Sequence, residues 1–189
     1  VDRKREAGHQ VLFSDVTGWK VKHYEGTEVS FVKSEEEPLF GEPVGKFSYR
    51  SNGAPGYFRI EPPKPIELKS FNGVLMWVFG NVWAWMPDPE TPFVMVSLVL
   101  EDAKGEIHTI QMDQVVWKFW SVMHKCVKPK VTDDERHTAF GGDNNWKLDF
   151  PAKLVAIEVT GGNNRDWRSI YFDSLIFRTE KPNPPKYDP

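Results

Sequence analysis

The chain has 189 residues, 27% of them charged, and a formal net charge of -3 at pH 7. This length is typical of one domain with a substantial core. The mild acidity argues against a nucleic-acid partner, which normally contacts a basic stripe. No apolar run approaches the ~18–20 residues that cross a bilayer, so we expect no membrane partner. The single cysteine, Cys126, excludes an internal disulfide.

Three parts of the chain differ in composition. Residues 1–10 are polar and are expected to be a frayed N-terminus. Residues 11–180 are expected to form one domain. Residues 181–189, KPNPPKYDP, are rich in proline and are expected to be the end of a linker.

Residues 28–33, 46–50 and 154–160 alternate between apolar and polar side chains, as in strands with one buried face. Residues 57–60, 66–68, 107–112 and 170–177 are expected to be further strands. Residues 115–122 are expected to be a further strand, and residues 34–45 a charged loop. No segment of a dozen residues keeps a helical period, and at most residues 133–140 hold a turn of helix. The pattern predicts an all-β protein with little or no helix, either a sandwich or a barrel.

The most apolar stretch is residues 73–100, which reads as strands 73–79 and 93–100 joined by an indole-rich connection. These strands do not alternate: Trp77 and Phe79 point one way, while Met76 and Val78 point the other. Both faces therefore need cover. Either the strands lie in mid-sheet beneath other elements, or one face is an apolar platform for a ligand.

Eight tryptophans are more than a domain of this size is expected to bury, so at least one indole should face solvent. An exposed indole stacks on the C–H face of a sugar ring, while carboxylates, amides, Arg and Lys bond the hydroxyls. Three places combine such groups; for any single indole, packing in the core is the alternative. They are Trp83 with Trp85, Trp117 with Trp120, and the loop of Asp143, Asn145 and Trp146 with Arg165 and its neighbours placed beside it. Trp117 and Trp120 cannot share one face of a regular strand, so one of them is expected in the core.

The order of several motifs is familiar. An opening Phe13, Asp15, Gly18 and Trp19 is followed by Gly80-Asn81, the hairpin LVLEDAKGE, the segment VVWKFWSV, the loop FGGDNNWKLDFP and a closing IYFDSLIF. This order resembles the β-jelly-roll carbohydrate-binding modules of the galactose-binding-like type, which bacterial polysaccharide-degrading enzymes carry. The resemblance covers residues 12–177. Its departure is the more apolar connection around Trp83 and Trp85, which leaves the position of a sugar site open.

The resemblance implies an antiparallel β-sandwich of jelly-roll type with two sheets. It also implies a non-catalytic module that binds a polysaccharide or oligosaccharide, tethered to a catalytic domain and located outside the cell, on its surface or in the periplasm. The residues expected to bind the carbohydrate are Trp83, Trp85, Trp120, Asp143, Asn145, Trp146 and Arg165.

The resemblance further implies a structural Ca²⁺ ion, held by the acid of the last strand, Asp173, and an early acid matched by Asp15. Calcium suits such oxygen ligands. From the residues alone, a carboxylate inside an apolar strand needs a partner, and a backbone N–H or an arginine would serve equally.

Two other functions stay open. A glycoside hydrolase or polysaccharide lyase of the same shape would need a pair of facing carboxylates or a Tyr/His/Arg cluster. The acids considered are Glu101, Asp102, Asp133, Glu135 and Glu158, of which Glu158 is most simply a solvated charge. A structural or interaction domain would cover its exposed aromatics with a neighbouring domain.

Overall fold

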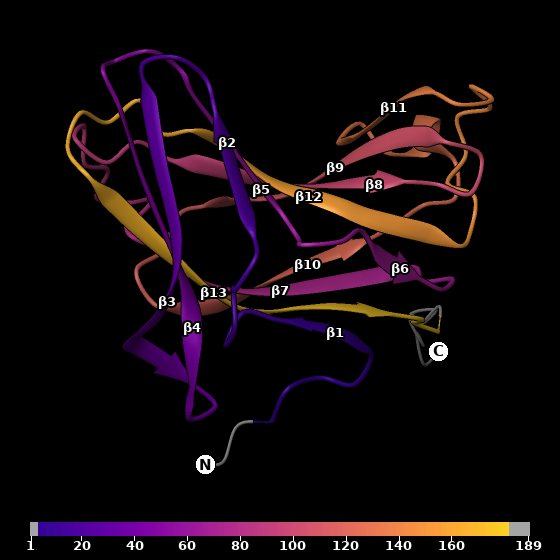
Figure 1. Ribbon diagram of the computed structural model, residues 1–189, viewed down its shortest axis with the longest axis horizontal. Helices are drawn as coiled ribbons and strands as arrows, with labels where there is room; N and C mark the ends of the chain where they lie inside the picture. Colours follow the sequence, from indigo (N-terminus) through magenta and orange to yellow (C-terminus); the bar gives the residue numbers. More distant parts are fainter. Residues whose placement is uncertain (1–3, 182–189) are drawn as a thin grey trace, which may run out of the picture.

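A computed structural model describes residues 4–181, which form thirteen strands in two antiparallel sheets that face each other (Figure 1). Sheet A contains β1 (His9–Leu12), β3 (Thr27–Leu39), β4 (Glu42–Ser51), β7 (Gly73–Phe79), β10 (Trp120–Cys126) and β13 (Arg168–Arg178). Sheet B contains β2 (Lys20–His23), β5 (Gly56–Glu61), β6 (Ile66–Leu68), β8 (Val94–Glu101), β9 (Glu106–Val115), β11 (His137–Gly141) and β12 (Ala152–Gly161). One short 3-10 turn, Val131–Asp133, completes the described elements. The predicted all-β sandwich of two sheets is confirmed.

The strand order sets which residues are neighbours. Sheet A runs β10-β7-β13-β4-β3, with β1 beside β13; sheet B runs β11-β9-β8-β12-β5-β2, with β6 beside β12. The apolar strands β7 and β8 lie in opposite sheets. The indole-rich connection between them therefore crosses from one layer to the other at one end of the sandwich.

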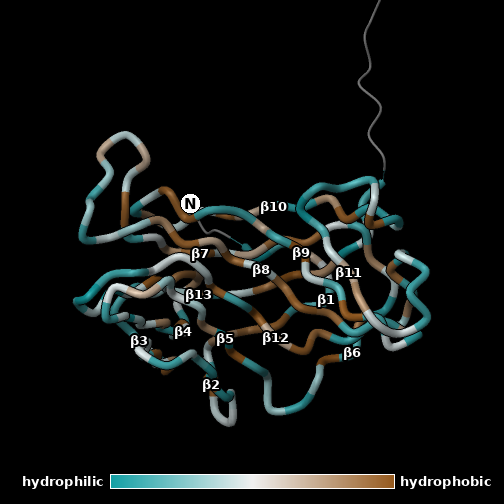
Figure 2. Tube along the Cα trace, turned by 90° about the horizontal axis from the view of Figure 1, so that it is seen from above, coloured by the Kyte–Doolittle hydropathy of each residue, from teal (hydrophilic) through white to brown (hydrophobic). Residues whose placement is uncertain are grey.

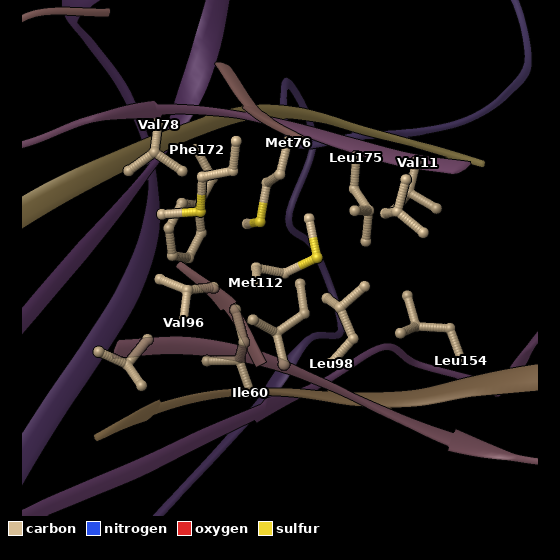
Figure 3. Close-up of a cluster of buried hydrophobic side chains, with 14 of the residues drawn as sticks. Val11, Ile60, Met76, Val78, Val96, Leu98, Met112, Leu154, Phe172 and Leu175 are labelled. Carbon is tan, nitrogen blue, oxygen red and sulfur yellow. The ribbon is translucent and has the colours of Figure 1, made fainter. Parts of the chain in front are cut away.

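The core lies between the sheets. Figure 3 shows Met76, Val78 and Leu175 from sheet A pointing toward Val96 and Leu98 from sheet B, and all five are fully buried. In Figure 2 the same strands appear as hydrophobic segments, with hydrophilic loops at the ends. Burying each such side chain is worth about 1.5–3 kcal/mol. Because β7 places its even-numbered residues in this core, its odd-numbered residues face outward.

Residues 34–45 are not a loop, as the sequence suggested, but continue β3 and β4 into a long hairpin. Its turn is Phe40-Gly41, with φ of 56° and 75°, which suits a two-residue hairpin turn. The pairing register shifts between Ser34 and Leu39, so Pro38 lies in the irregular part of an edge strand, where its missing N–H is tolerated.

The segment 115–122 was also predicted wrongly, since β9 runs to Val115 and β10 begins only at Trp120. Between them the chain bends against Gly80, where an added Cβ would lie 2.1 Å from the carbonyl oxygen of Trp117. The Trp117 indole donates to the carbonyl of Val78 at 3.0 Å and packs against the core. The bend thus separates Trp117 from Trp120, and of the two it is Trp117, partly buried, that packs against the core.

The N-terminus is more ordered than predicted. From His9 on it forms β1 against β13, the Glu6 carboxylate accepts a hydrogen bond from the indole of Trp77, and Arg5 reaches Asp173. Polar residues that looked frayed are therefore partners of polar groups on sheet A. The proposed linker, apart from Lys181, lies outside the described residues. None of the described helical structure has the length and apolar character needed to cross a membrane.

Candidate functional site

A row of partly exposed side chains crosses the outer face of sheet A. Register pairs Trp120 with Phe79, Phe79 with Tyr171, and Tyr171 with Lys46, on β10, β7, β13 and β4 in turn. The ring centres of Trp120 and Phe79 are 5.7 Å apart and those of Phe79 and Tyr171 5.8 Å apart, with Lys46 Nζ 5.8 Å from the Tyr171 ring. At about 4.8 Å per strand, these four residues, the outer row, span about 14 Å. β7 thus lies in mid-sheet between β10 and β13, and its outer face carries this partly exposed row.

The outer row ends in hydrogen-bonding groups. Lys46 Nζ donates to both carboxylate oxygens of Glu36, at 2.9 and 2.7 Å, and the Tyr171 hydroxyl donates to the same carboxylate at 2.6 Å. The bond from Lys46, helped by that from Tyr171, lowers the pKa of Glu36. Burial and the neighbouring carboxylate raise the pKa of Tyr171, so its phenol stays protonated at neutral pH. A carboxylate, an ammonium and a phenol together suit the hydroxyls of a sugar.

Beside the outer row lies a second aromatic group in the β7–β8 connection. Trp83 and Trp85 stack with ring centres 4.7 Å apart and an interplanar angle of 27°, and Phe119 lies 5.3 Å from Trp83. We call Trp83 and Trp85 the indole pair. Trp85 is 73% exposed, more than any other tryptophan. Because Phe119 directly precedes Trp120, the indole pair lies next to one end of the outer row.

Hydrogen bonds close the connection that carries the indole pair. Asp88 accepts from the backbone N–H of Glu90 and from the Thr91 hydroxyl, at 3.0 and 2.9 Å. Arg168, at the start of β13, donates in turn to the Thr91 hydroxyl at 2.6 Å. The connection is therefore anchored to sheet A.

The loop with Asp143, Asn145 and Trp146 lies at the opposite end of the sandwich, toward β11 (Figure 1). Asn145 Nδ2 bonds the carboxylates of Asp143 and Asp149, at 2.8 and 2.7 Å, and the Trp146 ring is 49% exposed. Arg165 follows β12, whereas this loop precedes it. Ten extended residues, about 30 Å of chain, separate the two, so they do not form one site.

Arg165 instead lines a surface hollow with Glu28, Arg50 and Asn52 at the end where the indole pair lies. There Arg50 sits 4.9 Å above the ring of Trp167, which is 44% exposed. The structure thus groups Trp83 and Trp85 with Trp120, and leaves Arg165 and the loop of Trp146 as separate places. The predicted binding residues did not include five residues of this surface: Glu36, Lys46, Phe79, Phe119 and Tyr171. The outward direction of Phe79 was visible in the sequence, but its strand neighbours were not.

The two acids predicted to hold calcium have other partners. The fully buried carboxylate of Asp173 accepts hydrogen bonds from Arg5 Nε at 3.1 Å and Nη2 at 3.2 Å, and Arg5 also bonds Glu42 at 2.8 Å. The exposed carboxylate of Asp15 accepts from the backbone N–H of Thr17. The guanidinium thus occupies both oxygens of Asp173, so a Ca²⁺ ion could bind there only by displacing Arg5. Calcium at Asp15 and Asp173 stays an untested prediction.

Two of the acids considered for hydrolysis, Glu158 and Asp102, lie away from the outer row. Glu158 is on the outer face of sheet B, where it is not a free solvated charge: it pairs with Arg59 at 3.0 Å and accepts from the Tyr57 hydroxyl. Burial, with this bond to Glu158, raises the pKa of Tyr57 to about 12. Asp102 is buried in the β8–β9 hairpin at the other end.

Solved structures share this architecture. The family 11 carbohydrate-binding module from Clostridium thermocellum, in complex with a β-1,3-1,4-mixed-linked tetrasaccharide, superposes with a TM-score of 0.58 and 15% identity, covering 93% of this chain and 100% of that one. A structure described for the promiscuous specificity of carbohydrate-binding modules of the β-sandwich superfamily gives a TM-score of 0.56 and 10% identity, covering 87% of this chain. The chain has the fold of these modules.

The module fold also occurs inside longer chains. The present chain spans 58% of the length of the superfamily structure just described. It matches an exo-β-agarase with a TM-score of 0.54 and 10% identity, covering 95% of this chain and 26% of that one. No protein-family model and no curated protein matches the sequence.

Proposed function

We propose that the protein is a non-catalytic module that binds a polysaccharide or oligosaccharide on the indole pair and the outer row. The exposure of Trp85 carries the proposal. The Trp85 indole, 73% in solvent, is followed by the exposed Met86, and its stacking partner Trp83 contacts the exposed Phe119. Contiguous apolar patches of this kind mark interaction sites. The fold shared with carbohydrate-binding modules supports the same conclusion.

Binding would rest on stacking and on hydrogen bonds to hydroxyls. Trp83 holds the ring of Trp85 in one orientation, so little conformational freedom remains to be lost when a pyranose covers it. Trp120 and Tyr171 extend the aromatic surface along the outer row, and Lys46 with Glu36 would select the hydroxyl pattern at its far end.

We also propose that the module is tethered to a catalytic domain and acts outside the cell, on the cell surface or in the periplasm. The occurrence of this fold within the chain of an exo-β-agarase supports the tether. A tethered module keeps its enzyme near the polymer and so raises the local substrate concentration.

Affinity electrophoresis through gels of mixed-linkage β-glucan, mannan, xylan or agarose tests the proposal. We expect at least one polymer to retard the protein, and Trp120→Ala to weaken that binding about tenfold because it removes one end of the outer row. Release of sugar from any polymer would favour the hydrolase or lyase. Dimerisation with no retardation in any gel would favour an interaction domain.

A further inference from the structure

The β8–β9 hairpin contains a buried group of polar side chains that plays no part in the proposed glycan site. The side chains of Asp102, Glu106 and His108 are fully buried. His108 Nε2 lies 3.3 Å from Asp102 Oδ2 and 3.6 Å from Glu106 Oε2, and one ligand atom of each residue lies within 4.8 Å of the others. In the described part of the chain, Glu106 Oε2 has no hydrogen-bond partner. A buried, unpartnered carboxylate oxygen is costly, so it needs a further group.

Backbone N–H groups fix the orientation of both carboxylates. Asp102 Oδ1 accepts from the N–H groups of Lys104 and Glu106, each at 2.9 Å, and Asp102 Oδ2 accepts from that of Asp149 at 3.2 Å. Glu106 Oε1 accepts from the N–H of Trp146 at 3.3 Å. Asp102 Oδ2 and the unpartnered Glu106 Oε2 both face His108 Nε2.

The other ring nitrogen of His108 contacts a second buried histidine. His108 Nδ1 and His137 Nε2 are 2.8 Å apart, so one of the two nitrogens carries a proton and donates a hydrogen bond to the other. When the ring of His108 is neutral and its proton is on Nδ1, the lone pair of Nε2 faces two carboxylate oxygens. When Nε2 instead carries the proton and bonds Asp102, Glu106 Oε2 is still left without a donor. One imidazolium would in any case balance only one of two buried carboxylates.

We propose that Asp102 Oδ2, Glu106 Oε2 and His108 Nε2 bind a divalent transition-metal ion of the zinc class. With bonds of 2.0–2.2 Å, ligand atoms of a tetrahedral zinc site lie about 3.3–3.6 Å apart, which matches the two distances above. The imidazole distinguishes this class from calcium and magnesium, which prefer oxygen ligands. His137 completes the arrangement, because a metal-bound imidazole donates its other N–H to a neighbouring acceptor.

The ion would fasten a loop rather than take part in glycan binding. Through Trp146 and Asp149, the carboxylates of the site hold the loop of residues 141–149 against the hairpin. This site lies at the opposite end of the sandwich from the indole pair. The metal proposal and the glycan proposal can therefore fail independently.

Titration of chelator-dialysed protein with Zn²⁺, followed by calorimetry and metal analysis, tests the site. We expect one tightly bound equivalent, and a rise in Tm of about 5–10 °C with free Zn²⁺ at 100 times its Kd. Glu106→Gln should lose that equivalent. A second, partly exposed group, His124, Cys126 and Glu180, could hold zinc at the surface. The matched control is therefore a double variant in this group, His124→Ala combined with Cys126→Ser. The control should keep the buried equivalent.

Loss of the equivalent in the control but not in Glu106→Gln would overturn the proposal, as would absence of zinc binding by the wild-type protein. The latter result would mean that protons alone balance the cluster. A measurement on the wild-type chain guards against misfolding of Glu106→Gln: added Zn²⁺ should slow amide hydrogen exchange in residues 141–149. Unchanged exchange there would contradict the site.

Discussion

Replacing Trp85 with alanine is expected to lower the affinity for the retarding polysaccharide at least tenfold, about 1.4 kcal/mol, while leaving the fold intact. The ring is 73% exposed and stacks on Trp83, so its removal takes away proposed binding surface and little core packing. Surface substitutions of this kind change the free energy of unfolding by about 0.5 kcal/mol or less. Isothermal titration calorimetry and thermal unfolding of the same preparation separate the two effects.

The comparison variant is Trp146→Ala, which removes another half-exposed indole at the opposite end of the sandwich. It should bind like the wild-type protein. If Trp146→Ala weakened binding and Trp85→Ala did not, the site would lie instead in the loop with Asp143 and Asn145. An Arg165→Ala variant tests the remaining predicted place in the same way.

Replacing Arg5 with alanine is expected to lower the free energy of unfolding by about 3 kcal/mol, because it leaves the carboxylate of Asp173 buried without its counter-charge. For a chain of this length, that loss corresponds to a fall in Tm of about 6–12 °C. Urea unfolding measures the free energy directly. A loss below about 1 kcal/mol, as for a surface ion pair, would contradict the structural role of Arg5.

Asp173→Asn, alone and combined with Arg5→Ala, provides the control. Since the two side chains act on each other, the double variant should lose less stability than the sum of the single variants. Adding Ca²⁺ to chelator-dialysed wild-type protein should leave Tm unchanged. A rise in Tm that disappears in Asp173→Asn and in Asp15→Asn would support the calcium site.

Most of the sandwich follows from local pattern. β7 has the limits expected for residues 73–79, and β12 and β13 are only a few residues longer than the expected strands. These strands could be predicted because their side chains alternate or form short apolar runs between turns. The long β3–β4 hairpin was not predicted, because its outer part is charged and contains Pro38. Such an edge needs no alternating apolar face, so only the turn at Phe40-Gly41 marks it.

The binding surface was predictable only in part. The excess of indoles correctly implied that some face solvent, since none of the eight is fully buried and three are exposed. Phe79 contacts both Trp120 and Tyr171 because β7 lies between β10 and β13 in the sheet, an order that brings together residues far apart in the sequence. Alternation within one strand carries no information about which strand lies beside it.

Polar residues were the hardest to interpret. Asp102 and Glu106 flank a glycine-containing turn and look like ordinary hairpin residues, yet both are buried against His108. Arg5 lies in a polar terminus that seemed frayed, yet it neutralises Asp173. Arg5 is far from Asp173 in the sequence, and the backbone N–H groups of Asp149 and Trp146 that hold the two carboxylates come from outside the hairpin, so composition and spacing could not reveal these contacts.

The central claim is that exposed indole surface at one end of the sandwich binds carbohydrate. Titration of ¹⁵N-labelled protein with an oligosaccharide from the retarding polymer, followed through the eight indole N–H signals, tests it most directly. The signals of Trp85, Trp83 and Trp120 should shift, while those of Trp117, bonded to the Val78 carbonyl, and Trp146 should not. Saturable binding that shifts none of the first three signals would contradict the account.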